Sequence, residues 1–472
     1  MPAPVRVIGG GLAGPEAAWQ LARQGLAVEL WEMRPQVSTP AHQTAALAEL
    51  VCSNSLKSEA ADSAPWLLKQ ELRLGGSLLL DCAARAAVPG GQALTVDRER
   101  FSALVEQALA EQPRVVIRRQ EVRALPESPL MVLATGPLTS GPLAEALARL
   151  TGSQHLYFYD AISPIVEADS VDRSRGYAGS RYGAGWTGAG GAPDQPGTSG
   201  SRGNAVPGPA PLDDSGGDYW NCPFDRPQYE RFHDALLAAE SYPLHPFEQP
   251  RYFEACLPLE VLARRGRDTL RFGPMKPVGL ADPRTRRLPY AVVQLRRENL
   301  RADSYNLVGF QNHLRFGAQA ELLRLIPGLE QARWLRLGQV HRNSYLNAPA
   351  LLNERLRLRA QPNVFVAGQL CGTEGYVEAI ATGWLAGRFA AAAALAQPLA
   401  APPRETALGS LLHYIRHGRA EGAAGYTPVN ITFDLLPPLA APERDRGRRR
   451  QAQCAAALAA CTAWLRQQER AA

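Results

Sequence analysis

Short apolar runs near both ends of the chain predict the strands of an α/β fold. The run "VRVI" at residues 5–8 precedes an alanine-rich amphipathic stretch at 13–23, and "LAVELWE" follows at 26–32. Two further runs, at 130–133 and 363–366, each lead into a glycine. Because short apolar runs that alternate with helical patterns favour a parallel sheet, we predict a Rossmann-like α/β domain.

A glycine-rich turn joins the first predicted strand to the first helix. Gly9, Gly11 and Gly14 have the spacing G-x-G-x-x-G, and Glu32 ends the next strand about 20 residues further on. Glycines let the backbone approach a pyrophosphate, which the positive end of the helix stabilises. Glu32 would accept hydrogen bonds from a ribose hydroxyl. These residues predict a dinucleotide site.

Two later segments indicate which dinucleotide is bound. The apolar run at 130–133 leads into Gly136, and the later run leads into Gly368 and Gln369 before a helix predicted near Gly375. This arrangement resembles that of the two-dinucleotide-binding flavoproteins, in which the last helix directs its N-terminus at the flavin. The resemblance implies that FAD is the cofactor and that five residues lie near it: Gly136, Gly368, Gln369, Glu374 and Gly375.

The position of these runs predicts a discontinuous organisation. We expect an FAD-binding domain of residues 1–155 and 340–398, an inserted α/β domain of residues 156–339, and a mostly helical C-terminal region of residues 399–472. Residues 184–217 contain ten Gly and five Pro in 34 positions. Such a composition is typical of a flexible linker.

The positive charge of the chain is carried almost entirely by arginine. The net charge is +6 and the pI about 9.0, which suits an anionic partner. Of 51 basic residues only Lys57, Lys69 and Lys276 are lysines, which leaves 51 − 3 = 48 arginines. An ammonium differs chemically from a guanidinium, so each retained lysine is a candidate for a specific role.

Two of the seven cysteines lie among polar residues. Cys52 stands in "ELVCSNSLKSE" and Cys222 in "DYWNCPFDRPQYERF", where Pro223 favours a turn or an extended segment. We predict that the two thiols converge in a cleft. No C-x-x-C pair is present, so no metal site is predicted. The chain shows neither a secretory leader nor a long apolar run, so we expect a cytoplasmic protein with no membrane contact.

Several long motifs give the chain a resemblance to one family. "LVCSNSLKSE", "DYWNCPFDRPQYERF", "DTLRFGPMKPVGL" and "AGQLCGTEGYVEA" resemble those of the TrmFO family, the folate- and FAD-dependent tRNA (uracil-5-)-methyltransferases. The resemblance implies methylation of C5 of uridine 54 in the tRNA T-loop. It also implies methylenetetrahydrofolate as the one-carbon donor and NADPH or NADH as the reductant.

The resemblance also suggests roles for the polar cysteines. Uracil C5 is a poor nucleophile until a group such as a thiolate adds to C6, and the thiolate leaves again after C5 loses its proton. Cys222 matches the family motif "NCP" and is the predicted C6 nucleophile. Cys52 is the predicted second catalytic thiol, as base or as guard of a flavin adduct. Lys57 would lower the pKa of a nearby thiol.

Further residues are candidates for contact with substrate. Lys276 is expected to bind folate, flavin or phosphate, and Tyr345 to stack on the isoalloxazine or the pterin, although a core position is equally compatible with its sequence. The remaining candidates for substrate or tRNA contact are His341, Arg342, Asn343, Arg264, Arg265 and Arg287.

Three other functions remain open on the sequence. The nearest is an MnmG-like FAD-dependent modification of wobble uridines, which requires a longer chain and a protein partner. A small-molecule flavin oxidoreductase is disfavoured because the sequence shows no second nucleotide-binding fingerprint that leads into a helix. A non-catalytic RNA-binding flavoprotein would have no catalytic need for two cysteines in polar surroundings. We expect no obligate protein partner.

Overall fold

The computed structural model describes most of the chain. The described residues are 3–39, 41–51, 55–127, 129–152, 155–181, 217–242, 257–299, 303–418, 426–439, 441 and 443–471, with side chains left out at 155–162, 339–344 and 469–471. Cys52, Cys256 and residues 184–216 of the predicted linker lie outside the described residues. Within this part of the chain, no helix is long and apolar enough to cross a membrane.

The chain divides into two units. Unit 1 comprises residues 1–86, 98–158 and 342–472, and unit 2 comprises residues 87–97 and 159–341. Unit 1 therefore includes the C-terminal residues 399–472, which the sequence analysis kept separate from the FAD-binding domain.

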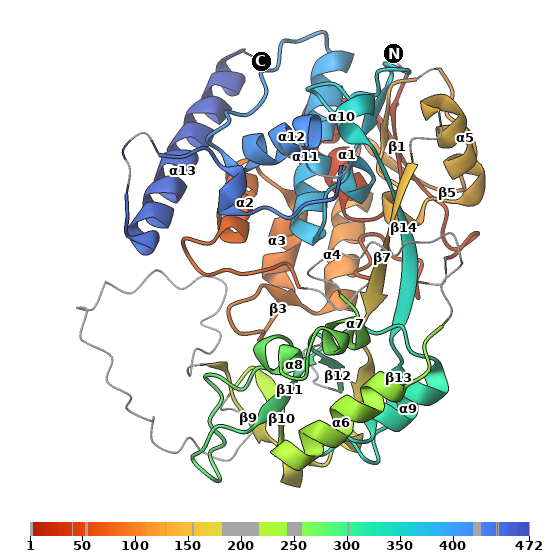
Figure 1. Cartoon of the computed structure of the whole chain (residues 1–472). Coiled ribbons are helices and arrows are strands. Elements are labelled where there is room, and N and C mark those ends of the chain that lie inside the picture. Colours follow the sequence, from red (N-terminus) through yellow and green to blue (C-terminus); the bar gives the residue numbers. More distant parts are fainter. Residues whose placement is uncertain are drawn as a thin grey trace. The chain divides into compact units, whose positions relative to one another are not determined.

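Unit 1 is built on a parallel five-stranded sheet with the strand order β15-β6-β1-β2-β5 (Figure 1). The predicted apolar runs form four of its strands, β1 (Val5–Ile8), β2 (Val28–Glu32), β6 (Met131–Leu133) and β15 (Val364–Val366), and the fifth strand, β5 (Val115–Arg119), was not predicted. The outermost strand β15 comes from far along the sequence and pairs with β6. This sheet confirms the predicted Rossmann-like fold class.

Two helices of unit 1 approach each other closely. α1 (Ala13–Arg23) follows β1, and α11 (Tyr376–Ala394) follows β15. A Cβ built on Gly383 of α11 would lie 2.3 Å from the carbonyl oxygen of Ala13, and one on Gly387 would lie 2.7 Å from that of Ala17. The two glycines therefore let the backbones touch, which fixes the start of both helices at the same end of the sheet.

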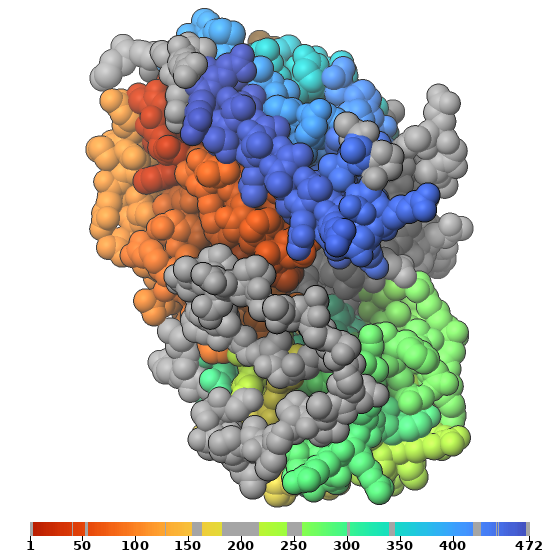
Figure 2. Space-filling model, turned by 90° about the vertical axis from the view of Figure 1, so that its left-hand side faces the viewer, coloured from red at the N-terminus to blue at the C-terminus, as the bar shows by residue number. Residues whose placement is uncertain are grey.

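The remaining elements of unit 1 surround this sheet. They are α2 (Ala64–Leu74), α3 (Leu78–Arg85), α4 (Arg98–Ala110), α5 (Gly141–Thr151), α10 (Ala348–Leu351), α12 (Ala407–His417) and α13 (Arg446–Ala471). The C-terminal helix α13, dark blue in Figure 2, packs on α2. Trp464 of α13 lies 6.0 Å from Trp384 of α11, measured between ring centroids. The C-terminal region is thus part of the core of unit 1.

Unit 2 contains an antiparallel sheet of order β13-β8-β12-β11-β10-β9. Its strands are β8 (Ile165–Glu167), β9 (Tyr177–Ala178), β10 (Tyr219–Phe224), β11 (Ala291–Arg297), β12 (Ser304–Leu307) and β13 (Trp334–Arg336). Its helices are α6 (Arg226–Ala238), α7 (Leu259–Arg264), α8 (Thr269–Phe272) and α9 (Phe316–Leu323). Two strand pairs complete the fold: β3 (Ala87–Val88) with β4 (Thr95–Val96), and β7 (His155–Ile162) with β14 (Gln339–Leu346).

Candidate functional site

A cavity at the carboxyl ends of the parallel strands collects most of the predicted cofactor residues. It is lined by the β1–α1 turn, by the segments that follow β2, β5 and β6, and by the start of α11. Seven residues that the sequence predicted for FAD line it: Gly9, Gly11, Glu32, Gly136, Gly368, Gln369 and Gly375. Ligands of open α/β sheets bind at this edge, so the position suits a dinucleotide.

The three glycines of the fingerprint have different functions. Gly9 has φ +110°, and a Cβ there would lie 2.4 Å from the carbonyl oxygen of Ala134. A Cβ on Gly14 would lie 1.8 Å from the carbonyl oxygen of Gly9, so Gly14 brings α1 close to the strand without lining the cavity. A Cβ on Gly11 would meet no described atom within 4 Å. The open space at Gly11 is where a pyrophosphate fits.

Two helix N-termini lie at the cavity. The N-cap residues are Leu12 for α1 and Gly375 for α11, and among the described residues no side-chain hydrogen bond caps either position. The first amides of a helix need acceptors, and its dipole favours negative charge. With the room at Gly11, these two ends fit the diphosphate and the flavin ring of FAD.

Glu32 is held at the cavity by a buried arginine. Its Oε2 accepts from the amide of Gly10 at 2.8 Å, and its Oε1 accepts from Nε of Arg34 at 2.8 Å. Burial raises the pKa of Glu32, but the hydrogen bond and charge of Arg34 outweigh this, and the net pKa is lowered. Arg34 also pairs with Glu49 at 2.7 Å. Oε1 also accepts from the backbone amide of Arg34, so Glu32 is a fixed carboxylate with one lone pair, on Oε2, left for a ribose hydroxyl.

Arg34 and several other lining residues were not predicted from the sequence. A charged residue two positions after an apolar strand was the available signal for Arg34, since parallel strands place such positions at the ligand edge. The unpredicted residues that also line the cavity include His42, Glu49, Gln120, Thr135, Thr139 and Tyr376.

The segment that carries the first polar cysteine begins at the cavity wall. Val51, which directly precedes Cys52, lines the cavity. Lys57 follows on the described side of the gap, with φ +60° and its Nζ 2.6 Å from Oε1 of Glu378 in the first turn of α11. Lys57 also donates to Oδ1 of Asn430. Because Glu378 is fully buried and faces Lys57, the charge of this lysine is paired.

Lys69 of α2 is buried beneath the same segment. Its Nζ donates to the carbonyl oxygens of Leu56 at 2.9 Å and Lys57 at 3.1 Å, and lies 3.0 Å from Oε1 of Glu59. An ammonium has three donors, and these three acceptors satisfy them. Burial lowers the pKa of Lys69 to about 8, partly offset by the charge of Glu59.

Cys222 occupies a different environment from the one predicted. It lies in β10 with no exposed surface, within the hydrophobic core of unit 2. Burial raises the pKa of this thiol to about 12, so the thiolate is scarce at neutral pH. The extended backbone agrees with the prediction made from Pro223. The predicted role of Cys222 as the nucleophile therefore requires a movement that exposes its thiol.

Tyr345 occupies a core position, one of the two alternatives that its sequence left open. Its side chain is 1% exposed, and it does not line the cavity at the strand ends. Its hydroxyl donates to the carbonyl oxygen of Tyr426 at 3.0 Å, and the two rings pack 6.2 Å apart. Tyr345 is a core residue of unit 1, and not a stacking platform for the isoalloxazine or the pterin. The neighbouring side chains of His341, Arg342 and Asn343 lie outside the described part.

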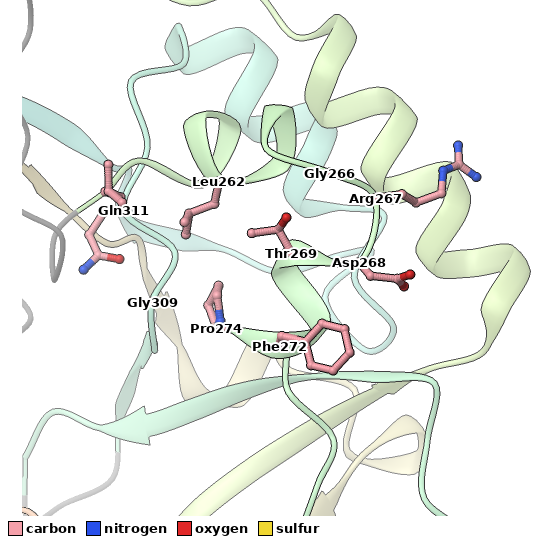
Figure 3. Close-up of a pocket in the computed structure, with 11 residues that line it drawn as sticks. Leu262, Gly266, Arg267, Asp268, Thr269, Phe272, Pro274, Gly309 and Gln311 are labelled. Carbon is pink, nitrogen blue, oxygen red and sulfur yellow. The ribbon is translucent and has the colours of Figure 1, made fainter.

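The basic candidates for tRNA contact lie on the surface of unit 2. Arg264, Arg265, Lys276 and Arg287 are all exposed. The same unit has an open hollow between α7, α8 and the loop at 309–311 (Figure 3). The hollow is lined by Leu257, Leu262, Gly266, Arg267, Asp268, Thr269, Phe272, Gly273, Pro274, Gly309 and Gln311.

Comparisons with known proteins agree with this architecture. The sequence matches the family described as "Glucose inhibited division protein A" at residues 4–188 and 209–398. The structure of Aquifex aeolicus GidA superposes with a TM-score of 0.65 at 16% identity, covering 99% of this chain and 76% of that chain. The fold is thus that of the GidA flavoproteins.

Closer relatives define the family within this class. A protein of Koribacter versatilis is 55% identical over 98% of this chain and 98% of its own length, and one of Solibacter usitatus is 58% identical over 95% and 94%. Both are named methylenetetrahydrofolate–tRNA-(uracil-5-)-methyltransferase TrmFO. The chain belongs to the TrmFO family.

Proposed function

We propose that this protein methylates C5 of a uridine in tRNA, with methylenetetrahydrofolate as the one-carbon donor and FAD as the cofactor. The observation that carries the proposal is the similarity, over nearly the full length of both chains, to relatives named for this activity. The cavity at the strand ends supports it, because its open glycine and two free helix ends suit FAD. The position in tRNA is uridine 54 of the T-loop.

The chemistry requires a nucleophile and a source of electrons. A thiolate adds to C6 of the uracil, and C5 attacks the methylene carbon of the folate. Loss of the C5 proton then expels tetrahydrofolate and leaves an exocyclic methylene group on C5. Reduced FAD, when bound, would supply the hydride that turns this methylene into a methyl group as the thiolate leaves C6, and NADPH or NADH would restore the reduced flavin. The residues of the chain bind the cofactor, hold the thiol and exclude water.

The two polar cysteines have different surroundings. The Cys222 thiol is buried in an apolar core, and this burial raises its pKa to about 12, so attack on a uracil requires a movement that exposes the thiol. Cys52 directly follows Val51, which lines the cavity at the strand ends. We propose that Cys222, which stands in the family motif, is the nucleophile that attacks C6, and that Cys52 is the second catalytic thiol.

The tRNA is held by the basic surface of unit 2. Arg264, Arg265, Arg287 and Lys276 are exposed cations on this unit, and phosphate contacts supply most of the affinity of proteins for nucleic acid. Because tRNA is an intracellular substrate, the protein acts in the cytoplasm. The alternatives, an MnmG-like wobble-uridine modification and a small-molecule flavin oxidoreductase, are less well supported, because the relatives that match nearly the full length of the chain are named TrmFO.

One assay tests the proposed function. The purified yellow protein is incubated with unmodified tRNA, methylenetetrahydrofolate and NADPH or NADH, and the nucleosides are analysed by mass spectrometry. We expect 5-methyluridine, and its loss when uridine 54 of the tRNA is replaced by cytidine. Turnover of the flavin without any 5-methyluridine would refute the function.

A further inference from the structure

One aromatic ring of unit 2 is exposed beside a hollow. Phe272 is the last residue of α8, and it is 79% exposed, the largest exposed fraction of any large apolar residue in the described part of the chain. It lines the hollow between α7, α8 and the loop at 309–311, which has a volume of about 840 Å³ (Figure 3). A lone exposed apolar side chain is ordinary, so the surroundings of the ring decide what it can bind.

The backbone that carries this ring is fixed by the core. Leu270 and Met275 are fully buried in the hydrophobic core of unit 2, and the amide of Met275 donates to the carbonyl oxygen of Leu270 at 2.8 Å. On the opposite wall Gly309 has φ +77°, and a Cβ there would lie 2.7 Å from Cβ of Pro274. The loop at 309–311 therefore contacts the segment after α8, and the hollow between them belongs to the packed fold.

Two polar side chains of the hollow have bonding capacity left. Gln311 is 7% exposed, and neither its side-chain amide nor the hydroxyl of Thr269 is bonded to any described residue. Buried amides are normally hydrogen-bonded, so Gln311 indicates a ligand. An amide offers donors and an acceptor side by side, which is the pattern that the edge of a nucleobase complements.

The sequence around the hollow is basic. Residues 262–276 carry five cations and one acid, so their net charge is 5 − 1 = +4. The acid, Asp268, pairs with Arg271 at 2.7 Å, and the guanidinium of Arg271 lies 3.7 Å from the centroid of the Tyr290 ring. Arg267, which also lines the hollow, pairs with Asp234. The other three cations are exposed and suit phosphate groups: Arg264, Arg265 and Lys276.

We propose that the hollow binds one unpaired base of tRNA, stacked on Phe272 and hydrogen-bonded at its edge by Gln311, with the exposed cations on the adjacent phosphates. Single-stranded segments of RNA are bound in this way, by aromatic rings on which unstacked bases stack. The inference rests on the proposed function, which supplies tRNA as the ligand. The base is not the methylated one, because methylation takes place at the flavin and the hollow shares no lining residue with the FAD cavity.

Substitutions of Phe272 separate stacking from a simple apolar contact. Phe272→Tyr and Phe272→Trp keep a flat ring, Phe272→Leu keeps only an apolar side chain, and Phe272→Ala removes both. Because the ring is exposed, these variants should keep the melting temperature and the FAD content of the wild type. Phe316→Ala is the matched control, since it removes the same ring from α9, where Phe316 is 42% exposed and lies outside the hollow.

The variants are compared as full-length, FAD-loaded proteins by fluorescence anisotropy with tRNA between about 50 mM and 200 mM salt. For Phe272→Ala and Phe272→Leu we expect about tenfold weaker affinity at every salt concentration, the size of one lost base stack. The slope of log affinity against log salt should not change, because no charge is removed. Phe272→Tyr, Phe272→Trp and Phe316→Ala should stay within about twofold. Gln311→Met should weaken binding about fivefold with the same slope, because it keeps the length of the side chain and loses its hydrogen bonds.

Several results would overturn the inference. Unchanged affinity in Phe272→Ala, or an equal loss in Phe316→Ala, would show that the ring holds no base. Full affinity in Phe272→Leu would show an apolar contact without stacking, and a changed salt slope in Phe272→Ala would show that the phosphate contacts were disturbed instead. Wild-type protein that binds tRNA but forms no 5-methyluridine would refute the proposed function alone. Wild-type protein that does not bind tRNA would refute both.

Discussion

The ammonium of Lys57 lies 2.6 Å from Oε1 of Glu378, a fully buried carboxylate in the first turn of α11. The same oxygen accepts from the amide of Ile431 at 2.9 Å. A Cβ built on Gly375, which lines the FAD cavity, would lie 2.6 Å from Nζ of Lys57 and 2.5 Å from Oε2 of Glu378. The pair therefore brings a compensated positive and negative charge to the wall of the cofactor site.

Removal of the carboxylate should change the electrostatics of the flavin. Glu378→Gln keeps an oxygen acceptor but leaves the charge of Lys57 uncompensated, and a positive charge favours the reduced, more negative flavin. We expect the reduction potential of bound FAD to rise by roughly 30 mV, equivalent to about 1.4 kcal/mol for a two-electron couple. Spectroelectrochemical titration measures the change. Glu59→Gln is the control, and an equal shift there would contradict the assignment to the Lys57–Glu378 pair.

The glycines at the cavity should separate cofactor binding from folding. Gly11→Ala places a methyl group in open space, so the protein should fold with an unchanged melting temperature but bind FAD at least about tenfold more weakly, a loss of 1.4 kcal/mol. Gly14→Ala places a methyl group against the carbonyl oxygen of Gly9, so it should lower the melting temperature of the apoprotein itself. Titration of the apoproteins with FAD and thermal unfolding distinguish the two effects. Equal behaviour of the two variants would contradict this division.

Burial of the Cys222 thiol gives a prediction about pH. The pKa is raised to about 12 in the folded protein, while the unfolded thiol ionises near 8.5, so the folded state retains the proton over this interval. Stability from this group is present below pH 8.5 and declines as the pH rises toward 12. The difference in unfolding free energy between the wild type and Cys222→Ala should therefore shrink from pH 8 to pH 10, as measured by denaturant titration.

The roles of the two thiols are separated by trapping the covalent complex. Cys222→Ala should lose the covalent complex with 5-fluorouridine tRNA and, as a core substitution, about 1–2 kcal/mol of stability. Cys52→Ala should abolish product but keep the covalent complex, because the thiol that attacks C6 is still present. A covalent complex that persists in Cys222→Ala, with FAD content intact, would move the nucleophile away from Cys222.

Tyr345 provides a test of a core position. Tyr345→Phe removes the donor to the buried carbonyl oxygen of Tyr426 and should cost about 1–2 kcal/mol of stability. The flavin absorption spectrum and kcat should remain those of the wild type, because the ring does not line the cavity. A shifted flavin spectrum in Tyr345→Phe would instead place the ring against the cofactor.

The parts of the site that the sequence predicted well are those set by local rules. Gly9, Gly11 and Glu32 lie at a strand–helix–strand turn whose geometry follows from their spacing, and the cavity contains all three. Cys222 lies among apolar side chains, unlike the polar setting predicted for it, because its polar neighbour Asn221 faces the other side of β10. Successive residues of a strand point to opposite faces, so a polar neighbour along the sequence is not a neighbour in space.

Other features required tertiary contacts that no local pattern contains. The sequence around Lys69 and Arg34 has an ordinary amphipathic pattern. Their hydrogen bonds and ion pairs form with residues distant in the sequence, such as Leu56 for Lys69 and Glu49 for Arg34. The scarcity of lysine drew attention to Lys57 and Lys276, but only the structure shows that Lys69 binds the segment after Cys52. Buried charges of this kind are satisfied by the fold and are therefore visible only within it.

The surface of unit 2 gives a prediction about salt. Arg264→Gln and Lys276→Gln each remove one exposed cation, and if each contacts a phosphate the slope of log affinity for tRNA against log salt should fall by about 1 per substitution. Arg284→Gln is the matched control, because Arg284 already pairs with Asp282 at 2.7 Å and has less free charge to offer. Filter binding or fluorescence anisotropy between 50 mM and 200 mM salt covers the range in which such slopes are measured. Equal slopes for the wild type and both variants would exclude these two residues from the tRNA surface. A change of slope in Arg284→Gln as large as that in Arg264→Gln would show that the ion pair with Asp282 does not keep Arg284 from contacting tRNA.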